Sequence, residues 1–344
     1  GVTTAADLGG RAEDLASFDG ESEAARIISP DLVYSGPHIA IKDGHPAALV
    51  SLVVPFPLDL LVRPQVSFEV EDRASVDAAI TSLKENRAEI LKITVDHVPI
   101  TAPAIDEKLA AYAAARGQEQ GMRVGVHVGS NADVRVALKA NPDFLAHLPY
   151  QERLSEDLWK SLVRLKIPSM PTIGVFDAAS DLPKGEMPFN RDEHARWIDA
   201  GLARSIRSKP SDWSVPAVEE WIELVAKGRA ARRSNAALYR KAPELLLVGS
   251  DSPSIGWPAG AGLQTEMRLL QESGLTPLQI LRGVTLNNAR VLGLKDRGTI
   301  EIGKRADLIL VGGNPLLGVG HLNGITDVFL KGKQIEVCRR PQRN

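Results

Sequence analysis

Residues 89–95 read EILKITV and residues 122–128 read MRVGVHV, with a helix-patterned stretch, residues 105–120, between these two apolar runs. Neither run alternates strictly between apolar and polar residues, which is typical of strands buried on both faces. Asp106 and Gly121, at the two ends of the middle stretch, are residue types that begin and end helices. This order predicts two neighbouring parallel strands joined by a helix.

The same alternation extends outward in both directions along the chain. Further strands are expected at residues 1–7, 32–35, 144–148, 170–176 and 245–249, and further helices at residues 131–140 and 155–165 and from Thr276 and Thr285 onward. Strands and helices that alternate over this length favour a (β/α) barrel or a doubly wound sheet.

The C-terminal residues have a different pattern. Residues 306–312, 325–331 and 334–339 are expected strands joined by short turns, with no helix between them. This pattern is typical of a small antiparallel β module. We therefore divide the chain into an α/β part, residues 1–298, and a β module, residues 299–344.

Composition excludes several classes of protein. The 344 residues carry 41 Lys+Arg against 43 Asp+Glu, a net charge of −2, so the chain is not a broadly basic nucleic-acid binder. A single cysteine excludes an intrachain disulfide framework. The apolar runs are too short to cross a bilayer. We expect a small-molecule partner, no nucleic acid and no membrane span. Assembly into a homo-oligomer and the cellular compartment are left open.

Four ionisable residues lie within, or directly after, apolar strand-like runs: Lys92, His127, His147 and Asp251. In (β/α) barrels the carboxyl ends of the strands form the active-site face, so these side chains would converge. Histidine and carboxylate are the usual ligands of a catalytic zinc-type ion. A bound ion would also account for Lys92, because a buried ammonium group is unfavourable unless it is neutralised or modified.

Each of these residues also has a purely structural interpretation. Lys92 could extend outward past the helices, and either histidine could be a hydrogen-bonded core residue. Asp251 follows Gly249 and Ser250 and could cap a helix. Their shared position at the end of a strand favours the common site over four independent accidents.

The sequence resembles the amidohydrolase superfamily, in particular its imidazolonepropionase-like and prolidase-like branch. The strongest likeness lies in residues 246–333, which include VGSDSP, GTIEIGKRADLILVGGNPL and VFLKGK. GVTTAADLGG at the start resembles the second barrel strand of that family, and EILKITVD, RVGVHVG and DFLAHLPY resemble strands four to six. The resemblance implies a TIM-type (β/α) barrel, with residues 299–344 forming part of a small β-sandwich.

The resemblance also implies a role for each of the four residues. Lys92 matches the lysine that becomes a carbamate in relatives and bridges two metal ions. His127 and His147 match metal ligands. Asp251 matches the aspartate that binds metal and takes a proton from the attacking water. The implied cofactor is a divalent metal, zinc, as one or two ions.

One family feature is absent from the sequence. Relatives carry a His-x-His pair on their first barrel strand, and none of the seven histidines here forms such a pair. We therefore expect the first barrel strand to be missing from this chain and to be encoded before Gly1. The alternative is a degenerate member that has lost part of its metal ligands.

Further residues are candidates for substrate contact. His38 and His45 fall in the expected loop at residues 36–46, His97 follows Lys92 by five positions, and Tyr150 follows His147 by three. Loops near a barrel mouth carry specificity, although exposure to solvent or loop packing would equally explain these residues. The stretch at residues 177–242 is long enough to form a lid.

The combined interpretation is a metal-dependent amidohydrolase that cleaves a C–N bond in an amide, a peptide-like or a cyclic amide substrate through a metal-activated water. A first alternative is a catalytically inactive barrel used for binding or assembly, which the missing His-x-His pair favours. A second is a lyase or aldolase that uses Lys92 as a Schiff-base amine.

Overall fold

A six-stranded parallel sheet forms the centre of the computed structural model, which describes residues 1–24, 26–181, 216–254 and 257–336. The strands follow the order β4-β3-β5-β6-β7-β8, and every neighbouring pair is parallel. Their bounds are His38–Ile41 (β3), Ser67–Val70 (β4), Ile90–Thr94 (β5), Arg123–His127 (β6), Phe144–Ala146 (β7) and Ser169–Met170 (β8). The predicted parallel unit therefore corresponds to β5 and β6.

A separate parallel pair stands beside this sheet. It consists of β1 (Thr4–Asp7) and β2 (Asp31–Tyr34), joined by helix α1 (Ala12–Glu23). Gly36, between β2 and β3, has a φ of +70°, a left-handed conformation that glycine adopts readily. Within the described residues the hydrogen-bonded strands form an open series, with β4 and β8 at the ends of the larger sheet.

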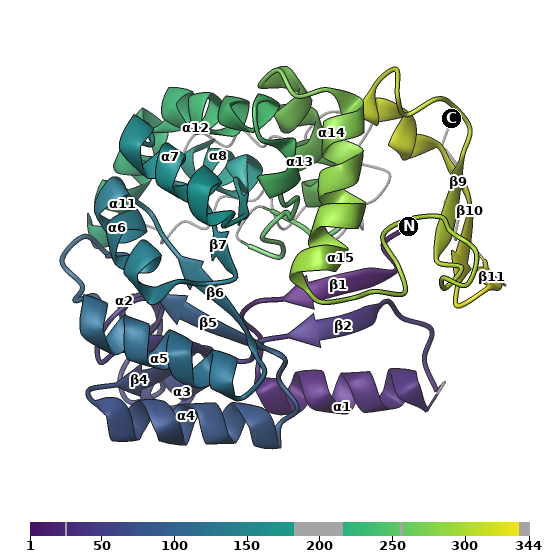
Figure 1. Ribbon diagram of the computed structural model, residues 1–344. Coiled ribbons are helices and arrows are strands. Elements are labelled where there is room, and N and C mark those ends of the chain that lie inside the picture. The colour runs from purple at the N-terminus through teal and green to yellow at the C-terminus, as the bar shows by residue number, and fades with distance from the viewer. Residues whose placement is uncertain (25, 182–215, 255–256, 337–344) are drawn as a thin grey trace.

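Helices cover the outer side of the strands, and Figure 1 shows α4 and α5 side by side along β4 to β6. The helices that follow the β3 to β8 strands are α2 (Ala47–Val53), α3 (Asp59–Val66), α4 (Arg73–Glu85), α5 (Glu107–Glu119), α6 (Asn131–Ala140), α7 (Glu156–Leu165) and α8 (Ile173–Asp181). Later helices are α11 (Pro216–Lys227), α12 (Arg229–Ala236), α13 (Ala261–Glu272), α14 (Pro277–Arg282) and α15 (Asn288–Val291). The expected caps Asp106 and Thr276 accept backbone N–H bonds at the starts of α5 and α14.

Two strand predictions need correction. The expected strand at residues 170–176 ends at Met170, because Pro171 has no N–H to continue the ladder and Thr172 adopts a φ of +44°. The apolar residues that follow belong to helix α8. The segment predicted as a strand at residues 245–249 is extended but makes only one bridge to the sheet, between Leu246 and Ser169.

The expected loop at residues 36–46 is also not wholly a loop. Residues His38–Ile41 form strand β3, which pairs with both β4 and β5, and the sequence analysis predicted neither β3 nor β4. The mistake follows from Gly36 and Pro37, which punctuate the chain directly before β3 and are typical of turns.

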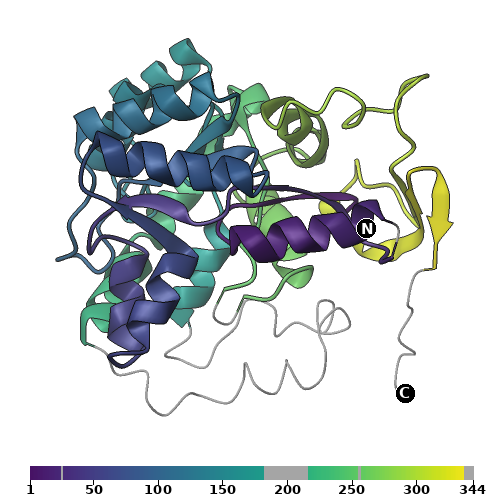
Figure 2. The same ribbon diagram turned by 90° about the horizontal axis from the view of Figure 1, so that it is seen from below.

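The C-terminal residues form the predicted antiparallel sheet. Its order is β11-β10-β9, with β9 at Leu308–Val311, β10 at Ile325–Leu330 and β11 at Lys333–Ile335. Figures 1 and 2 both show this sheet to one side of the strand and helix layers, near the N-terminus. The end of the last predicted strand lies outside the described residues. In the described part of the chain, no helix has the length and apolar character that a bilayer crossing requires.

Candidate metal centre

The four ionisable residues singled out in the sequence lie on a strand, or shortly after a strand or an extended segment. Lys92 lies on β5, His127 is the last residue of β6, and His147 comes directly after β7. Asp251 follows the extended segment at residues 246–249. Since Thr94 on β5 pairs with His127, and His127 pairs with Ala146 on β7, Lys92, His127 and His147 lie on or directly after three neighbouring strands, toward the carboxyl ends of the sheet.

His127 and His147 form the centre of this group. Their ring centres are 4.4 Å apart in an edge-to-face arrangement, and both side chains are buried. His127 Nε2 contacts Asp96 Oδ2 at 2.9 Å, and His147 Nδ1 contacts Thr172 Oγ1 at 2.5 Å. The other nitrogens, His127 Nδ1 and His147 Nε2, are buried without a hydrogen-bond partner. Buried polar atoms are normally satisfied, so two orphaned nitrogens on adjacent rings indicate an absent partner.

Lys92 and Asp251 complete the predicted set. Lys92 is only 5% exposed, and burial lowers the pKa of its ammonium group, although Asp251 and Asp96 act in the opposite direction. Asp251 has a φ of +56°, and its Oδ2 lies 3.9 Å from His147 Nε2, beyond hydrogen-bond distance. Its side chain is 41% exposed, so this carboxylate can meet both the buried histidines and solvent.

A second cluster shares His127 with the first. The carboxylate of Asp96, two residues after β5, contacts His127 Nε2, His45 Nδ1 at 2.7 Å and the Tyr150 hydroxyl at 3.1 Å. One ligand atom from each of His45, Asp96 and His127 lies within 4.8 Å of the others, a spacing that could also hold a cation. Asp96 ends the stretch EILKITVD and was not among the residues predicted for the site.

The pKa values of this centre follow from burial and from the contacts of Asp96. Burial lowers the pKa of His127 and holds the pKa of His147 well below its usual range, so both rings are neutral near pH 7. Burial alone would raise the pKa of Asp96, but His127 and His45 outweigh it and hold that pKa well below its usual range. Neutral imidazoles and ionised carboxylates are the protonation states in which these groups bind metal ions.

The remaining candidates lie at different distances from this centre. His45 and Tyr150 reach it through Asp96, and Tyr150 is almost fully buried, stacked on Phe176. The ring of His38 is buried between Thr94 Oγ1 and the Leu8 carbonyl. His97 is exposed, and its Nδ1–H donates to the carbonyl of Ala102 at 2.7 Å.

Helix α8 packs against this centre. Two buried acidic residues, Glu266 and Asp177, make hydrogen bonds that position the helix. Phe176 on α8 packs edge to face on His147. Glu266 accepts hydrogen bonds from the backbone N–H groups of Ile173 and Gly174 at the start of the helix, and burial raises the pKa of Glu266 to about 7.

The second acid connects α8 with α12. Asp177, 2% exposed, accepts from Arg232 at 2.7 Å and from Arg233 at 2.6 Å. Arg232 also donates to the Tyr150 carbonyl at 2.9 Å, which joins α12 to the loop after β7. Residues 182–215, the middle of the predicted lid, lie outside the described residues.

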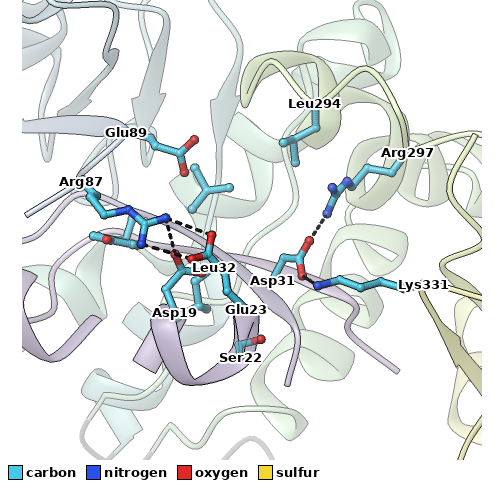
Figure 3. Close-up of a pocket in the computed structure, with 12 residues that line it drawn as sticks. Asp19, Ser22, Glu23, Asp31, Leu32, Arg87, Glu89, Leu294, Arg297 and Lys331 are labelled. Carbon is cyan, nitrogen blue, oxygen red and sulfur yellow. Dashed lines mark hydrogen bonds and ion pairs between the residues drawn. The ribbon is translucent and has the colours of Figure 1, made fainter. Parts of the chain in front are cut away.

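A separate pocket of about 380 Å³ lies at the opposite, amino ends of the strands (Figure 3). It is lined on one side by Arg87 with Asp19 and Glu23, and on the other by Asp31 with Arg297 and Lys331. These charges are paired with one another. We call Lys92, His127, His147 and Asp251 the carboxyl-end cluster. The buried nitrogens without a hydrogen-bond partner, His127 Nδ1 and His147 Nε2, lie in this cluster and not in the pocket.

The residues of the carboxyl-end cluster fit a divalent metal ion. Two neutral imidazole nitrogens without partners, a carboxylate beside them and a buried lysine give the mixed N and O donors that zinc-type ions accept. His127, His147 and Asp251 would hold the ion. A carbamate on Lys92, which the resemblance implies, would add an anionic oxygen.

Comparison with known proteins places this arrangement in a family. The fold and these groups define a broad class: α/β proteins in which histidine, lysine and carboxylate side chains gather at the carboxyl ends of parallel strands. The chain belongs to the amidohydrolase family, whose model matches residues 1–335.

Two curated relatives match parts of the chain. Adenine deaminase 2 of Latilactobacillus sakei subsp. sakei (strain 23K) is 25% identical over 154 residues, which are 41% of this chain and 25% of that protein. Imidazolonepropionase of Deinococcus radiodurans is 38% identical over 64 residues, 18% of this chain and 16% of that protein. These matches thus span a quarter or less of the relatives' own length.

Solved structures show the same fold over almost the whole chain. A Xaa-Pro dipeptidase with methionine bound in its active site superposes with a TM-score of 0.75 at 21% identity, covering 97% of this chain and 75% of that one. A prolidase-like protein from Bifidobacterium longum, described as putative, gives a TM-score of 0.73 at 21% identity, covering 100% and 75%. The expected α/β fold of this superfamily is therefore confirmed.

Proposed function

We propose that the chain is a metal-dependent amidohydrolase that hydrolyses a C–N bond in a small amide, a peptide-like or a cyclic amide substrate. The observation that carries this proposal is the pair of buried, unpartnered nitrogens on His127 and His147, beside Asp251 and Lys92. Relatives named as a deaminase, an imidazolonepropionase and a dipeptidase all act on bonds to nitrogen, which supports the same reaction class here.

Each residue has a defined task in this proposal. His127, His147 and Asp251 would hold the divalent ion, zinc in one or two copies, together with Lys92 in its carbamate form. A bound ion lowers the pKa of a coordinated water and polarises the scissile carbonyl group. Asp251, half exposed and next to His147, accepts the proton of the attacking water and returns it to the leaving nitrogen.

Substrate contacts come from the loops at the same edge. His45 is 13% exposed at its side chain and lies in the loop after β3, so it can reach a bound amide while it contacts Asp96. His38, His97 and Tyr150 remain proposed contacts, although His38 and Tyr150 are buried and could act only through a neighbour. The proposed partner is a small-molecule substrate. A homo-oligomer of this chain is also proposed.

The absence of a His-x-His pair from the 344 residues favours one alternative, an inactive barrel used for binding or assembly. The hydrolase should bind a divalent cation and cleave an amide, whereas the inactive barrel should do neither. Metal analysis, followed by zinc reconstitution and a panel of dipeptides, N-acyl amino acids and cyclic amides, separates them.

Zinc binding with hydrolysis of one substrate class supports the hydrolase. Asp251→Asn should then lower kcat by about 100-fold or more, the usual contribution of a positioned acid–base group. The matched control Asp157→Asn alters an exposed ion pair with Arg135 and should keep full activity. No bound zinc and no turnover after reconstitution would overturn the proposal in favour of the inactive barrel.

A further inference from the structure

The carboxylate of Asp96 is the meeting point of three donors from separate segments. Its Oδ1 contacts His45 Nδ1 at 2.7 Å, and its Oδ2 contacts His127 Nε2 at 2.9 Å and the Tyr150 hydroxyl at 3.1 Å. Asp96 itself is 1% exposed. Both of its oxygens are therefore occupied within the protein, and neither is turned to bulk solvent.

These contacts decide which nitrogen of His127 carries hydrogen. An ionised carboxylate only accepts hydrogen bonds, so Nε2 of His127 must be the N–H donor. In a neutral imidazole the other nitrogen then has a free lone pair. That nitrogen, Nδ1, is the buried atom without a hydrogen-bond partner.

His147 provides an instructive contrast. Its Nδ1 contacts the hydroxyl of Thr172, which can either donate or accept, so this contact does not fix the tautomer. Of the two histidines with orphaned nitrogens, only His127 has a partner that forces the lone pair onto the orphaned atom.

We propose that Asp96 is a positioning residue: it fixes the ring and the tautomer of His127 so that Nδ1 presents its lone pair to a divalent cation. This inference rests on the proposed cation site but adds a residue to it. Carboxylates that hydrogen-bond the far nitrogen of a metal-binding histidine commonly have this role.

Asp96 could instead bind the cation directly, together with His45 and His127, whose ligand atoms lie within 4.8 Å. The observations favour positioning for two reasons. The Asp96 oxygens are at hydrogen-bond distances from the two ring nitrogens. A cation among these three residues would also leave His127 Nδ1 and His147 Nε2 without partners.

The first experiment uses the ring nitrogens of the cation-free protein. In ¹⁵N-labelled wild type, His127 should carry hydrogen on Nε2, with a slowly exchanging ring proton that is absent from Asp96→Ala. His127→Gln assigns the signal. On addition of zinc, the resonance of Nδ1 should shift while Nε2 stays protonated. A ring protonated on Nδ1, or zinc bound to Nε2, would overturn the inference.

The second experiment measures zinc affinity by competition with a chelator. Asp96→Ala should weaken binding by about 10- to 100-fold, the usual effect of losing such a partner. Tyr150→Phe is the matched control, because it removes a donor from the same carboxylate and leaves the acceptor for His127; it should change affinity less than about 3-fold. Asp96→Asn keeps one acceptor oxygen and nearly the same volume, and should fall between them.

The outcomes separate this inference from the proposed function. If wild type binds no zinc, the cation site itself is wrong. If wild type binds zinc and Asp96→Ala binds it equally well, the cation site stands and the role of Asp96 is refuted. Unfolding midpoints of the cation-free proteins show whether a loss of affinity comes merely from a loss of folding.

Discussion

His127 and His147 lie edge to face with ring centres 4.4 Å apart, and each has one nitrogen in a hydrogen bond and one buried nitrogen without a partner. In the absence of a ligand this arrangement is unfavourable, because both rings were desolvated without replacement of a hydrogen bond. Substitutions can therefore remove the two nitrogens without a partner, His127 Nδ1 and His147 Nε2, and keep the hydrogen bonds of the other two nitrogens.

His147→Asn and His127→Gln test the cation site directly. Asparagine can retain the contact that His147 Nδ1 makes with Thr172, and glutamine the contact that His127 Nε2 makes with Asp96. Each variant should lose at least about 100-fold in zinc affinity, since loss of an outer partner alone costs about 10- to 100-fold. Stability of the cation-free protein should change by less than about 1 kcal/mol, because the bond is kept and the orphaned atom is gone.

Chelator competition and urea unfolding provide the two measurements. His97→Gln is the control, because His97 is exposed and bonds to the Ala102 carbonyl. Unchanged zinc affinity in both site variants would contradict the assignment of these nitrogens as ligands.

Glu266 should make the protein less stable as pH rises from about 4.5 to 7. Burial raises the pKa of Glu266 from 4.5 to about 7, so between these values the folded chain holds a proton that the unfolded chain has released. The stabilisation from this group is full below pH 4.5 and lost above pH 7. Linkage puts its size at roughly 3 kcal/mol.

Urea unfolding of wild type and Glu266→Gln between pH 5 and 8 checks this prediction. The stability of the variant should decline less with pH than that of wild type. Glu272→Gln, which alters a half-exposed residue of the same helix, should follow the wild-type profile. Parallel profiles for wild type and Glu266→Gln would show that Glu266 is charged in the fold throughout.

The charge of Asp177 should make a large contribution to the free energy of unfolding. Its carboxylate, 2% exposed, pairs with Arg232, also 2% exposed, and with Arg233. Asp177→Asn leaves the Arg232 guanidinium group buried without a counter-charge and removes the partner of Arg233, which is 29% exposed, and it should lower the free energy of unfolding by about 3–5 kcal/mol. Glu156→Gln, which breaks an exposed pair with Lys160, should cost less than about 1 kcal/mol in the same urea experiment. Equal stability of the two variants would refute the prediction.

Asp31 should stabilise the contact between β2 and the C-terminal residues, and it should do so only above acidic pH. Burial alone would raise the pKa of Asp31, but Arg305, Arg297 and Lys331 outweigh it and hold that pKa well below its usual range. This stabilisation is present above the unfolded pKa, about 3.9, and is lost as pH falls through the lower folded value.

Asp31→Asn should therefore destabilise the protein by about 1–3 kcal/mol at pH 7, with a difference from wild type that shrinks below about pH 4. Guanidinium unfolding at pH 7, 4 and 3 measures it. Asp296→Asn, which affects a half-exposed partner of Arg297, should stay within about 1 kcal/mol of wild type. A constant difference down to pH 3 would mean that the Asp31 charge is not responsible.

The sequence predicted the fold best where local signals agreed with burial. The β5 and β6 runs are apolar throughout, and Asp106 caps the helix between them, so chain order and capping residues led to the right unit. Residues 170–176 misled because a short apolar run is compatible with a strand or a buried helix, and Pro171 decided the outcome. Strand β3 was missed because Gly36 and Pro37 precede it.

The candidate site was likewise predicted only where residues contrast with their neighbours in sequence. Lys92, His127, His147 and Asp251 stood out because polar residues are rare in apolar runs, and the structure brings them to one edge. Asp96 has no such contrast with its neighbours. Its partners His127, His45 and Tyr150 are 31, 51 and 54 positions away in sequence, so its role becomes visible only once the strands are placed side by side.

The side chain of Arg297 donates to both Thr4 and Asp31, across 293 and 266 positions of sequence. A ribosome making this chain must therefore reach Arg297 before β1 and β2 can gain this partner. Contacts of such long range slow folding, and until they form, the segment that carries Arg297 is not held against β1 and β2. For production of the protein, slower translation or a lower temperature should consequently raise the yield of correctly closed molecules.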